Sequence, residues 1–491
     1  MNRFPRLLSV ITLAYLALPL FLFCIGWARP VYAVALVGCL VVCLWRALRD
    51  GVGMLAPAGS YPADLASWRL QRGALLRLLL GIGLIVLWVS LSGAGGFGYQ
   101  NPDWLNGRNN VLHDLMVRPW PVFYGLEHGQ PRPLVYGIAC FLPAALLGKL
   151  GSSWSLACQG VYAWTLAGVL LTYAWLVRLT GAGPLLCAVL FIFFSGMDIV
   201  GSALLGADIG VFRHLENWAN GWQFTSMTTL LYWAPNHALG GWLLVCLFMA
   251  EAMRRRCDTL LFLLCLSGLW SPYAGLGLVP FALVAGYQSR GKSVFSVQNI
   301  AALPVAVFLG LYFLSTDATA GQTGWIGHFR DMAADWPVYI LFIVLEYGLL
   351  ALILRAVLPE LRQPGWMREF FLIACLALAI FPLYKLGGDV THELCMRASI
   401  PAFFFLLYCT CRALTQSKAV RRTATYGLLA LMLVLGAFTP STEMLRSVYF
   451  VIYCGIGLTP DIPAPLSETA AHYVGSPYST FFRYLAKTPV E

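Results

Sequence analysis

The chain has 491 residues, of which 59% are hydrophobic and only 11% are charged, and its mean hydropathy is +0.73. Soluble domains carry about 25% charged residues, so this composition excludes a soluble globular protein and indicates a helical membrane protein. The net charge of +10 comes without a long basic run that contains interleaved aromatic residues, so nucleic acid is not the expected partner.

Continuous apolar runs predict an all-α, polytopic membrane protein with about 11–13 membrane helices. The runs lie at 7–27, 31–48, 74–93, 133–150, 157–177, 183–204, 237–253, 258–288, 298–315, 337–354, 369–386, 399–414 and 423–440. Because a second run follows the first at once, we expect a membrane anchor at the N-terminus and not a cleaved signal peptide.

Basic residues orient these runs, since Lys and Arg retain loops in the cytoplasm. Arg3 and Arg6 place the N-terminus inside, and the run Arg254–Arg256 places the end of the 237–253 helix inside. The intervening loops are then expected to share an outer face. They lie at 94–132, 205–236, 316–336 and 387–398, and the tail from 441 joins them.

One apolar run conflicts with this orientation. Three runs separate the 94–132 loop from the 205–236 loop, and an odd number of crossings would put these loops on opposite faces. We therefore expect 133–150, which contains Pro143, to be a half-helix or an interfacial segment that does not fully cross the bilayer.

The 258–288 run is also irregular, because Ser271 and Pro272 interrupt it. Both of its ends are expected inside. The pattern therefore predicts a hairpin of two helices with Ser271, Pro272 and Tyr273 at an apex near the outer face. A plain proline kink is the alternative.

The first outer loop gathers Asp103, Arg108, His113 and Asp114. A carboxylate that is held just above the hydrocarbon and partly desolvated can serve as a general base, and we assign this role to Asp103. A simple turn residue is the alternative for Asp103. His113 and Asp114 are candidate substrate-binding residues, although pairing with Arg118 is the simpler interpretation of Asp114.

Asp198, Trp233 and His237 are further candidates for binding substrate. Asp198 ends an apolar run, where a carboxylate is costly unless it is paired, solvated or bound to metal. His237 begins a helix, where free backbone N–H groups favour an anion. The simpler alternatives are N-capping by Asn236 and interfacial anchoring by Trp233.

The last outer loop before the tail contains Asp389, His392, Glu393 and Arg397. A guanidinium at the border of the next helix can pair with two phosphate oxygens at once, which makes Arg397 a candidate phosphate ligand. Asp389 and His392 are candidate substrate-binding residues, although the neighbouring acids and His392 could pair with Arg397 instead. Glu346 lies in the middle of an apolar run, where a hydrogen bond to a neighbouring helix is the alternative to a functional role.

Several catalytic motifs are absent from the sequence: a phosphate-binding Gly-x-x-x-x-Gly-Lys loop, a Gly-x-Ser-x-Gly elbow, a His-Glu-x-x-His motif and a Cys-x-x-Cys motif. We therefore expect neither ATP-driven nor serine-hydrolase chemistry. No cofactor is indicated, and a divalent metal stays an open alternative.

Taken together, several of these segments resemble bacterial membrane proteins of the GT-C glycosyltransferase type. The segments are Asp103-Trp104, His113-Asp114-Leu115, Trp120-Pro121, Ser195–Asp198, Trp233–His237, Ser271-Pro272 and Met396–Pro401. The resemblance implies a GT-C-like core at 74–440 with short interfacial helices in the first outer loop, preceded by an added helical pair and loop at 1–73 and followed by a periplasmic tail at 441–491. A paired-acid motif of the Asp-Glu or Asp-x-Asp kind is missing.

Such a protein is expected in the bacterial inner membrane, with its site on the periplasmic face. The resemblance implies transfer of a sugar from a polyprenyl-phosphate donor to a surface glycan, a lipid or a protein. Asp103 would take the acceptor proton and Arg397 would bind the leaving phosphate at one centre, which Asp198 and His237 line. The alternatives are a transporter or flippase of lipid-linked glycans, which needs polar groups on both faces or along the midplane, and a polysaccharide polymerase or ligase.

Overall fold

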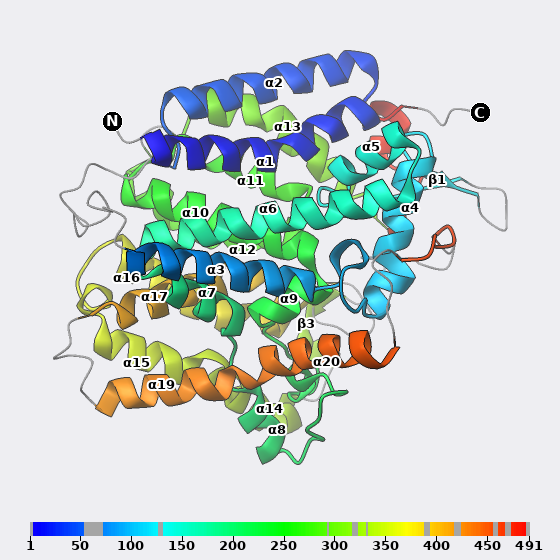
Figure 1. Ribbon diagram of the computed structural model, residues 1–491. Helices are drawn as coiled ribbons and strands as arrows, with labels where there is room; N and C mark the ends of the chain where they lie inside the picture. The colour runs from blue at the N-terminus through cyan, green and yellow to red at the C-terminus, as the bar shows by residue number, and fades with distance from the viewer. Residues whose placement is uncertain are drawn as a thin grey trace.

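The computed structural model describes residues 3–53, 72–125, 131–291, 294–316, 323–329, 332–386, 393–416, 424–454, 460–466 and 473–487. Within them, the chain forms a bundle of helices that run side by side (Figure 1). The α-helices are α1 (Arg3–Trp27), α2 (Pro30–Arg49), α3 (Arg72–Ser90), α4 (Asn109–Val117), α5 (Leu142–Gly151), α6 (Trp154–Thr180), α7 (Pro184–Phe193), α8 (Asp198–Leu204), α9 (Met227–Trp233), α10 (Pro235–Met253), α11 (Leu260–Gly268), α12 (Pro272–Gln288), α13 (Val297–Phe313), α14 (Met332–Ile343), α15 (Leu349–Val357), α16 (Trp366–Ile380), α17 (Ile400–Leu414), α19 (Ala424–Gly436) and α20 (Phe438–Cys454).

Short π-helical and 3-10 turns extend or connect these helices. The π-turns are η3 (Trp104–Arg108), η6 (Val344–Gly348), η9 (Leu394–Ala398) and η11 (Phe481–Leu485). The 3-10 turns are η2 (Ala94–Gly96), η4 (Leu215–Asn217), η5 (Ile326–His328), η7 (Pro359–Leu361) and η8 (Phe381–Leu383). Two antiparallel strand pairs complete the described structure: β1 (Phe123–Tyr124) with β2 (Arg132–Pro133), and β3 (Thr323–Trp325) with β4 (Tyr384–Leu386).

Ten helical stretches within the described ranges are long and apolar enough to cross a membrane, which confirms the predicted polytopic helical membrane protein. These stretches are Arg6–Trp27, Pro30–Arg49, Gly73–Ser90, Trp154–Thr180, Pro184–Leu204, Pro235–Met253, Met332–Val357, Trp366–Leu383, Leu394–Leu414 and Ala424–Tyr453. The sequence predicted slightly more spans. The difference arises at α5, at α13 and at the divided run 258–288, where the helices are shorter than the apolar runs or are interrupted.

The segment 133–150 agrees with the expectation of an incomplete crossing. Only its second half is helical, because α5 begins at Leu142 and has 10 residues. A helix of this length rises about 15 Å, which is half of the hydrocarbon thickness of a bilayer. The orientation deduced from the basic residues therefore does not require this segment to cross.

The run 258–288 folds as the predicted hairpin and not as one kinked helix. Helix α11 ends at Gly268, and Ser271 caps α12 by accepting a hydrogen bond from the Ala274 N–H at 3.0 Å. The two open ends of the hairpin meet where Cys257 Sγ lies 2.9 Å from Ser289 Oγ. The apex at Ser271 lies beside the start of α10, at the opposite end of the bundle.

Contacts between distant segments define one end of the bundle, which we call the basic end. Arg254 Nη2 donates to the Asp50 carbonyl at 3.0 Å, Gln298 Nε2 donates to Asp50 Oδ2 at 2.6 Å, and Arg412 Nη1 donates to the Thr180 carbonyl at 3.4 Å. The basic end comprises residues 46–53, 178–184, 251–260, 288–291, 294–298, 355–369 and 412–416. The positive-inside rule predicts that it faces the cytoplasm.

The opposite end, which we call the loop end, gathers the described parts of the four loops that the sequence placed on one face. Asn101 Nδ2 donates to the Tyr232 carbonyl at 2.9 Å, strand β3 pairs with β4, and Thr316 bridges to Gly475. The loop end lies at the right of Figure 1. It comprises residues 91–125, 131–141, 194–236, 323–329, 381–386, 393–399, 460–466 and 473–487.

The C-terminal segment lies across the loop end and reaches back to the N-terminal helices. Arg29 donates to the carbonyls of Arg483 and Ala486 at 2.8 and 3.0 Å, and Phe481 and Phe482 are buried. The sequence placed the start of this tail at residue 441. In the structure, α20 continues the helical stretch to Cys454, so the tail begins later than expected.

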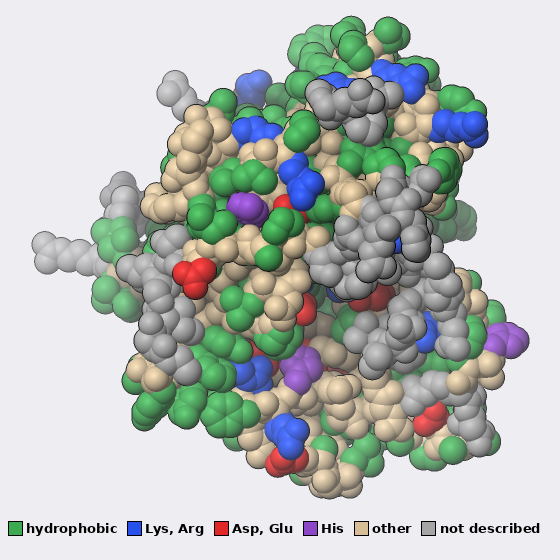
Figure 2. Space-filling view, turned by 90° about the vertical axis from the view of Figure 1, so that its right-hand side faces the viewer, with side chains coloured by type: hydrophobic (Ala, Val, Ile, Leu, Met, Phe, Trp, Pro, Cys, Tyr) green, Lys and Arg blue, Asp and Glu red, His purple; other side chains and the backbone are tan. Residues whose placement is uncertain are grey.

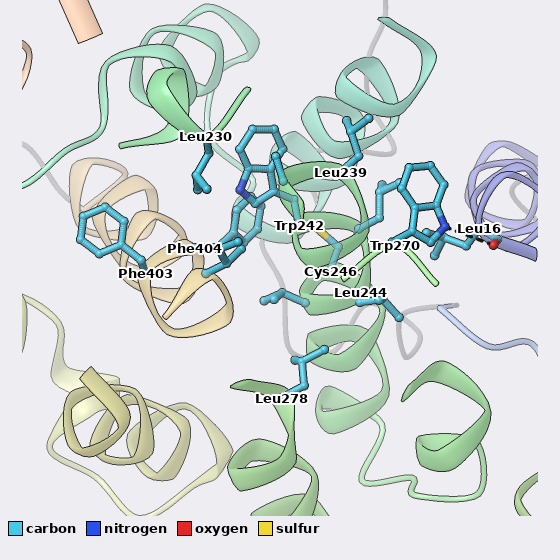
Figure 3. Close-up of a cluster of buried hydrophobic side chains, with 14 of the residues drawn as sticks. Leu16, Leu230, Leu239, Trp242, Leu244, Cys246, Trp270, Leu278, Phe403 and Phe404 are labelled. Carbon is cyan, nitrogen blue, oxygen red and sulfur yellow. Dashed lines mark hydrogen bonds between the residues drawn. The ribbon is translucent and has the colours of Figure 1, made fainter. Parts of the chain in front are cut away.

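Helix α10 lies at the centre of the bundle and is almost entirely buried. Trp242 on α10 packs among apolar side chains from α9 and α17, and Trp270 at the end of α11 donates to the Leu16 carbonyl at 3.4 Å (Figure 3). Gly240 lets Trp270 approach, since a Cβ at this position would collide with the indole. This packing fixes the start of α10, which carries His237, against the hairpin apex.

Candidate active site

Six segments that are far apart in the sequence bring polar side chains together at the loop end. They are η3 with the preceding Asp103, the segment around Tyr136, the start of α10, the apex between α11 and α12, η9, and the C-terminal segment around Tyr473. We call their shared group the central cluster, which consists of Asp103, Arg108, Tyr136, His237, Ser271, Arg397 and Tyr473. Figure 2 views the molecule from this end and shows a hollow near the middle of the face, with acidic, basic and imidazole side chains around it.

The loop that carries Asp103 is anchored by Asn101. Asn101 Oδ1 accepts the N–H groups of Asp103 and Trp104 at 3.1 and 3.2 Å, while Asn101 Nδ2 and Trp104 Nε1 both donate to the Tyr232 carbonyl at 2.9 Å. Asp103 itself is half exposed and lies 3.2 Å from Arg108 Nη1. The carboxylate is thus positioned by the protein but is open to a substrate.

Arg108 is a buried cation behind Asp103, with only 2% of its side chain exposed. Burial alone would lower the pKa of Arg108, but Tyr136, the Asp103 carboxylate and Tyr473 together raise it above its ordinary value. Its Nε has no hydrogen-bond partner among the described residues. Gly107 allows this arrangement, because a Cβ there would collide with the Tyr473 hydroxyl.

His237 lies at the first turn of α10 and is 3% exposed. Its Nδ1 is hydrogen-bonded to Ser271 Oγ at 2.7 Å, whereas Nε2 has no partner in the described part of the chain. The guanidinium groups of Arg108 and Arg397 interact electrostatically with the ring. Buried polar atoms are nearly always hydrogen-bonded. The unpartnered Nε2 is therefore a candidate contact for a polar group of a ligand.

Arg397 lies in the π-turn η9 and forms an ion pair with Glu393, one turn earlier. Its guanidinium carbon is 5.9 Å from the centre of the Tyr273 ring, at the hairpin apex. The pairing with Glu393 is the one that the sequence left as an alternative to phosphate binding. The centre of the Tyr273 ring also lies 6.2 Å from that of the His237 ring, so Arg397 and His237 both border Tyr273.

The sequence therefore identified three members of this cluster, Asp103, His237 and Arg397, and the structure brings them together. It missed Tyr136 and Tyr473, whose rings lie 4.7 Å apart, because neither stands near a recognisable motif. No local sequence pattern indicated that Tyr136 and Tyr473 lie close to each other. Arg108 was noted beside Asp103, but its burial could not be read from the sequence.

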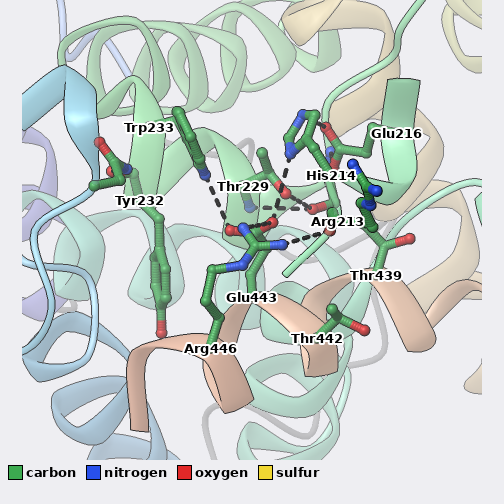
Figure 4. Close-up of polar contacts among 12 residues, drawn as sticks. Arg213, His214, Glu216, Thr229, Tyr232, Trp233, Thr439, Thr442, Glu443 and Arg446 are labelled. Atoms are coloured by element: carbon green, nitrogen blue, oxygen red, sulfur yellow. Dashed lines mark hydrogen bonds and ion pairs between the residues drawn. The ribbon is translucent and has the colours of Figure 1, made fainter. Parts of the chain in front are cut away.

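A second group of charged side chains lies where the loop end meets η6 and α20, and is shown in part in Figure 4. We call it the carboxylate cluster, which consists of Asp198, His214, Glu216, Glu346, Glu443 and Arg446. Glu443 accepts hydrogen bonds from Arg446 Nη1 at 2.7 Å and from Trp233 Nε1 at 3.0 Å, and His214 Nδ1 lies 3.5 Å away. Trp233, proposed above as a substrate contact, is therefore held by this cluster.

Asp198 and Glu346 belong to the carboxylate cluster and are both buried. Asp198 Oδ2 accepts hydrogen bonds from the hydroxyls of Ser195 and Thr439 at 3.0 and 2.8 Å, and the Asp198 and Glu346 carboxyl groups interact with each other. Trp218 Nε1 donates to Glu346 at 3.1 Å. Asp198 thus ties helices together, and the structure does not bring it into the central cluster as the sequence suggested.

Glu216 and His214 show how burial acts on this cluster. The pKa of Glu216 is raised to about 7, mainly by burial; His214 opposes the shift and the nearby Asp198 carboxylate adds to it. Burial would lower the pKa of His214, but Glu443 and Glu216 outweigh this effect and raise it. Glu216 also accepts the Ser226 N–H at 2.9 Å. The cluster is a network of paired groups in which His214 Nδ1 and Glu346 Oε2 have no hydrogen-bond partner among the described residues, although His214 Nδ1 lies 3.5 Å from Glu443.

The remaining predicted residues lie elsewhere. Asp114 is buried and accepts hydrogen bonds from Tyr124 at 3.0 Å, from Arg118 at 3.4 Å and from the Leu466 N–H at 2.9 Å. It anchors the C-terminal segment, so the simpler interpretation that pairs it with Arg118 holds. His113 packs edge-on against Trp154.

Two predicted residues, Asp389 and His392, fall outside the described residues. Among the residues that the structure describes, no group of three or more His, Cys, Asp or Glu side chains is arranged to hold a metal ion. The open alternative of a divalent metal therefore gains no support from this part of the chain. The chemistry that the central cluster offers is that of a carboxylate, an imidazole and two guanidinium groups.

Comparison with known proteins gives no match: no protein-family model, no curated protein and no solved structure is similar to this chain at a significant level. The structure therefore shows a polytopic helical membrane protein with a polar cluster at one end.

Proposed function

We propose that this protein is a glycosyltransferase that moves a sugar from a polyprenyl-phosphate donor to an acceptor at the loop end. The observation that carries the proposal is the meeting of a half-exposed carboxylate, Asp103, with two guanidinium groups and an imidazole that has a free nitrogen. Sugar transfer from a phosphate carrier needs a base for the acceptor hydroxyl and positive charge for the leaving phosphate. The cluster contains both.

In this proposal Asp103 is the catalytic base. Its carboxylate takes the proton of the acceptor hydroxyl as the hydroxyl oxygen attacks the sugar carbon and the bond to the carrier phosphate breaks. Arg108 lies 3.2 Å from Asp103 and holds the carboxylate in position. The half-exposed side of Asp103 is the side from which an acceptor can approach.

Arg397 provides the counter-charge for the phosphate, with His237 Nε2 as an additional hydrogen-bonding group. Binding of phosphate would require Arg397 to exchange its ion pair with Glu393 for the ligand, and two negative oxygens can replace the two of a carboxylate. His237 is held by Ser271 through Nδ1, so that Nε2 keeps a fixed direction. The unpartnered Nε2 supports a ligand at this position.

The distribution of polar side chains favours an enzyme over a transporter of lipid-linked glycans. A transporter needs binding groups at the midplane and at both faces. The middle of α10 is lined instead by buried apolar residues such as Trp242 and Leu243, and the central cluster lies at the loop end alone. The polar residues of the basic end, such as Glu251, pair with Arg254 and the Gly53 N–H.

The test is transfer of labelled sugar from polyprenyl-phosphate donors to membrane acceptors by purified protein in proteoliposomes. We expect Asp103→Asn to lower turnover by about 10²–10⁴-fold, the usual contribution of a general base. Asp208→Asn is the matched control, because Asp208 also pairs with an arginine at the loop end but is exposed, and it should leave turnover unchanged. Full activity of Asp103→Asn would end the assignment.

Donor binding gives a second measurement in the same proteoliposomes. Arg397→Ala should weaken binding of the polyprenyl phosphate, and Arg397→Lys should restore it only in part, because lysine cannot pair with two oxygens in one plane. Arg213→Ala, at the exposed pair with Asp208, is the control. Equal donor affinity for wild type and Arg397→Ala would remove Arg397 from the site.

A further inference from the structure

A separate feature of the molecule is an apolar groove between α1 and α6, which lie side by side in Figure 1. Its volume is about 770 Å³, within the range of about 300–1,000 Å³ that small-molecule sites occupy. The groove is lined by Leu7, Leu8, Ile11, Ala14, Tyr15, Ala17, Leu18 and Phe21 of α1, Leu44 of α2, and Trp164, Ala167, Leu170, Leu171 and Ala174 of α6. Its only hydroxyl, that of Tyr15, donates to the Trp164 carbonyl at 3.0 Å.

The groove runs from the middle of the bundle toward the basic end. Helices α1 and α6 are antiparallel, and the start of α1 packs on the last turns of α6: Trp175 Nε1 donates to Thr12 Oγ1 at 2.9 Å. Gly53 of the basic end lies against the same indole, where an added Cβ would be 2.9 Å from Trp175. The groove therefore opens on the half of the bilayer that the basic end borders.

Two arginines lie beyond the lining residues toward the basic end, Arg178 on α6 and Arg6 on α1. Arg178 follows Ala174 by four residues on α6 and so continues the face that lines the groove. It is half-buried, and its guanidinium carbon lies 5.2 Å from the centre of the Trp175 ring. Arg6 precedes Leu7 on α1 and is exposed. An apolar groove with basic side chains beyond one end suits an anionic lipid, which has apolar chains and a negatively charged headgroup.

We propose that this groove binds one anionic phospholipid, with an acyl chain between α1 and α6 and its headgroup phosphate at Arg178 and Arg6. The charge of the groove's end favours an anionic over a zwitterionic headgroup, since each basic side chain near the surface adds to the attraction. The site lies at the opposite end from the central cluster, so its occupant is a structural or regulatory phospholipid and not the sugar donor. The inference stands independently of the proposed function.

The experiment measures which lipids the protein retains. Wild-type protein is reconstituted into vesicles of phosphatidylcholine that contain a minor share of phosphatidylglycerol, then extracted in mild detergent, and its bound lipid is identified by mass spectrometry. We expect phosphatidylglycerol to be enriched over its share in the vesicle. Arg178→Gln should reduce the retained phosphatidylglycerol by about fivefold, the loss of one basic contact.

Two further variants separate the groove from general surface charge. Ala14→Trp places an indole in the groove from its exposed rim and should reduce retention of phosphatidylglycerol without removing a charge. Arg355→Gln removes an exposed arginine at the basic end of α15, outside the groove, and should leave retention unchanged. Thermal unfolding of each delipidated variant checks that the fold is intact.

Three results would overturn the proposal. They are retention of phosphatidylglycerol and phosphatidylcholine in the vesicle ratio, an equal loss in Arg355→Gln and Arg178→Gln, and preferential retention of polyprenyl phosphate that Ala14→Trp abolishes. The last result would assign the groove to the sugar donor instead.

Discussion

The two charged clusters differ in how their carboxylates are held. In the carboxylate cluster, Glu443 and Asp198 are buried and each accepts hydrogen bonds from two side chains. In the central cluster, the Asp103 carboxylate is half exposed and its ion-pair partner Arg108 is the buried group. A buried carboxylate with several partners fixes a fold, whereas an exposed carboxylate is available to a ligand. We therefore assign structure to the first cluster and chemistry to the second.

The largest expected effect breaks the carboxylate cluster at Arg446. Arg446→Met leaves Glu443 buried without its closest cation, and breaking a buried ion pair from one side typically costs about 3–5 kcal/mol. Thermal unfolding in detergent should show a large loss of stability. Arg213→Met removes the exposed side chain of an arginine whose carbonyl contacts Arg446, and it should change the midpoint of thermal unfolding little. A wild-type midpoint for Arg446→Met would contradict a structural role for the cluster.

The next prediction uses pH. The folded protein holds the Glu216 proton up to about pH 7, while the unfolded chain releases it near 4.5. Between these values the folded state binds more protons, so the free energy of unfolding decreases as pH rises, by about 3 kcal/mol for this group. His214, whose pKa is also raised, extends the decrease above 6.5.

Glu216→Gln tests this directly, since glutamine cannot ionise. Stability measured across pH 4.5–7 should fall less steeply in the variant than in wild type. Glu360→Gln is the control, because Glu360 is a partly exposed acid at the basic end that pairs with Arg412. Parallel pH profiles for wild type and Glu216→Gln would show that the Glu216 proton is not held by the fold.

Substitutions in the central cluster should have the opposite pattern, with a small effect on the free energy of unfolding and a large effect on donor binding. His237→Phe removes the hydrogen bond to Ser271, which is worth about 0.5–1.5 kcal/mol, and also removes the free Nε2. Unfolding should change only slightly while the affinity for the phosphate-bearing donor falls. A stability loss as large as that of Arg446→Met would make His237 a packing residue.

The smallest expected effect is that of Tyr473→Phe. The ring still packs on Tyr136, so only the hydroxyl beside Arg108 is lost, and stability should change by about 1 kcal/mol or less. If Tyr473 contacts substrate, KM for the acceptor should rise while the unfolding midpoint stays near that of wild type. An unchanged KM would mean that Tyr473 does not contact the acceptor and only shields Arg108 from solvent.

Much of the architecture followed from hydropathy and charge. The gathering of the loops at one end of the bundle, the short α5 and the hairpin at Ser271 were all predicted, because basic residues and the parity of crossings constrain the topology strongly. The end of the last spanning stretch was misplaced at 440. Helix α20 continues through Glu443 and Arg446, whose charges lower the local hydropathy although both side chains are buried. Their mutual pairing removes the cost that a hydropathy argument assumes.

The site was predictable only where a residue stands at a helix border or an irregular turn. Asp103, His237 and Arg397 had that signal. Three charged residues of the two clusters, Arg108, Glu346 and Arg397, lie in π-turns, which often occur at functional positions but cannot be read from a single sequence. Tyr473 enters the site through a contact across the whole chain, and no local pattern predicts such a contact.

The path of the C-terminal segment has a consequence for biogenesis. The chain leaves the ribosome from its N-terminus, so Asp103 and Arg108 enter the membrane long before Tyr473 is synthesised. The first outer loop gains its contact with the C-terminal segment only when the Leu466 N–H reaches Asp114, and Arg29, between α1 and α2, donates to the Ala486 carbonyl later still. Residues 460–487 thus complete the wall around Arg108, and the polar end of a nascent chain stays incomplete until they are translated.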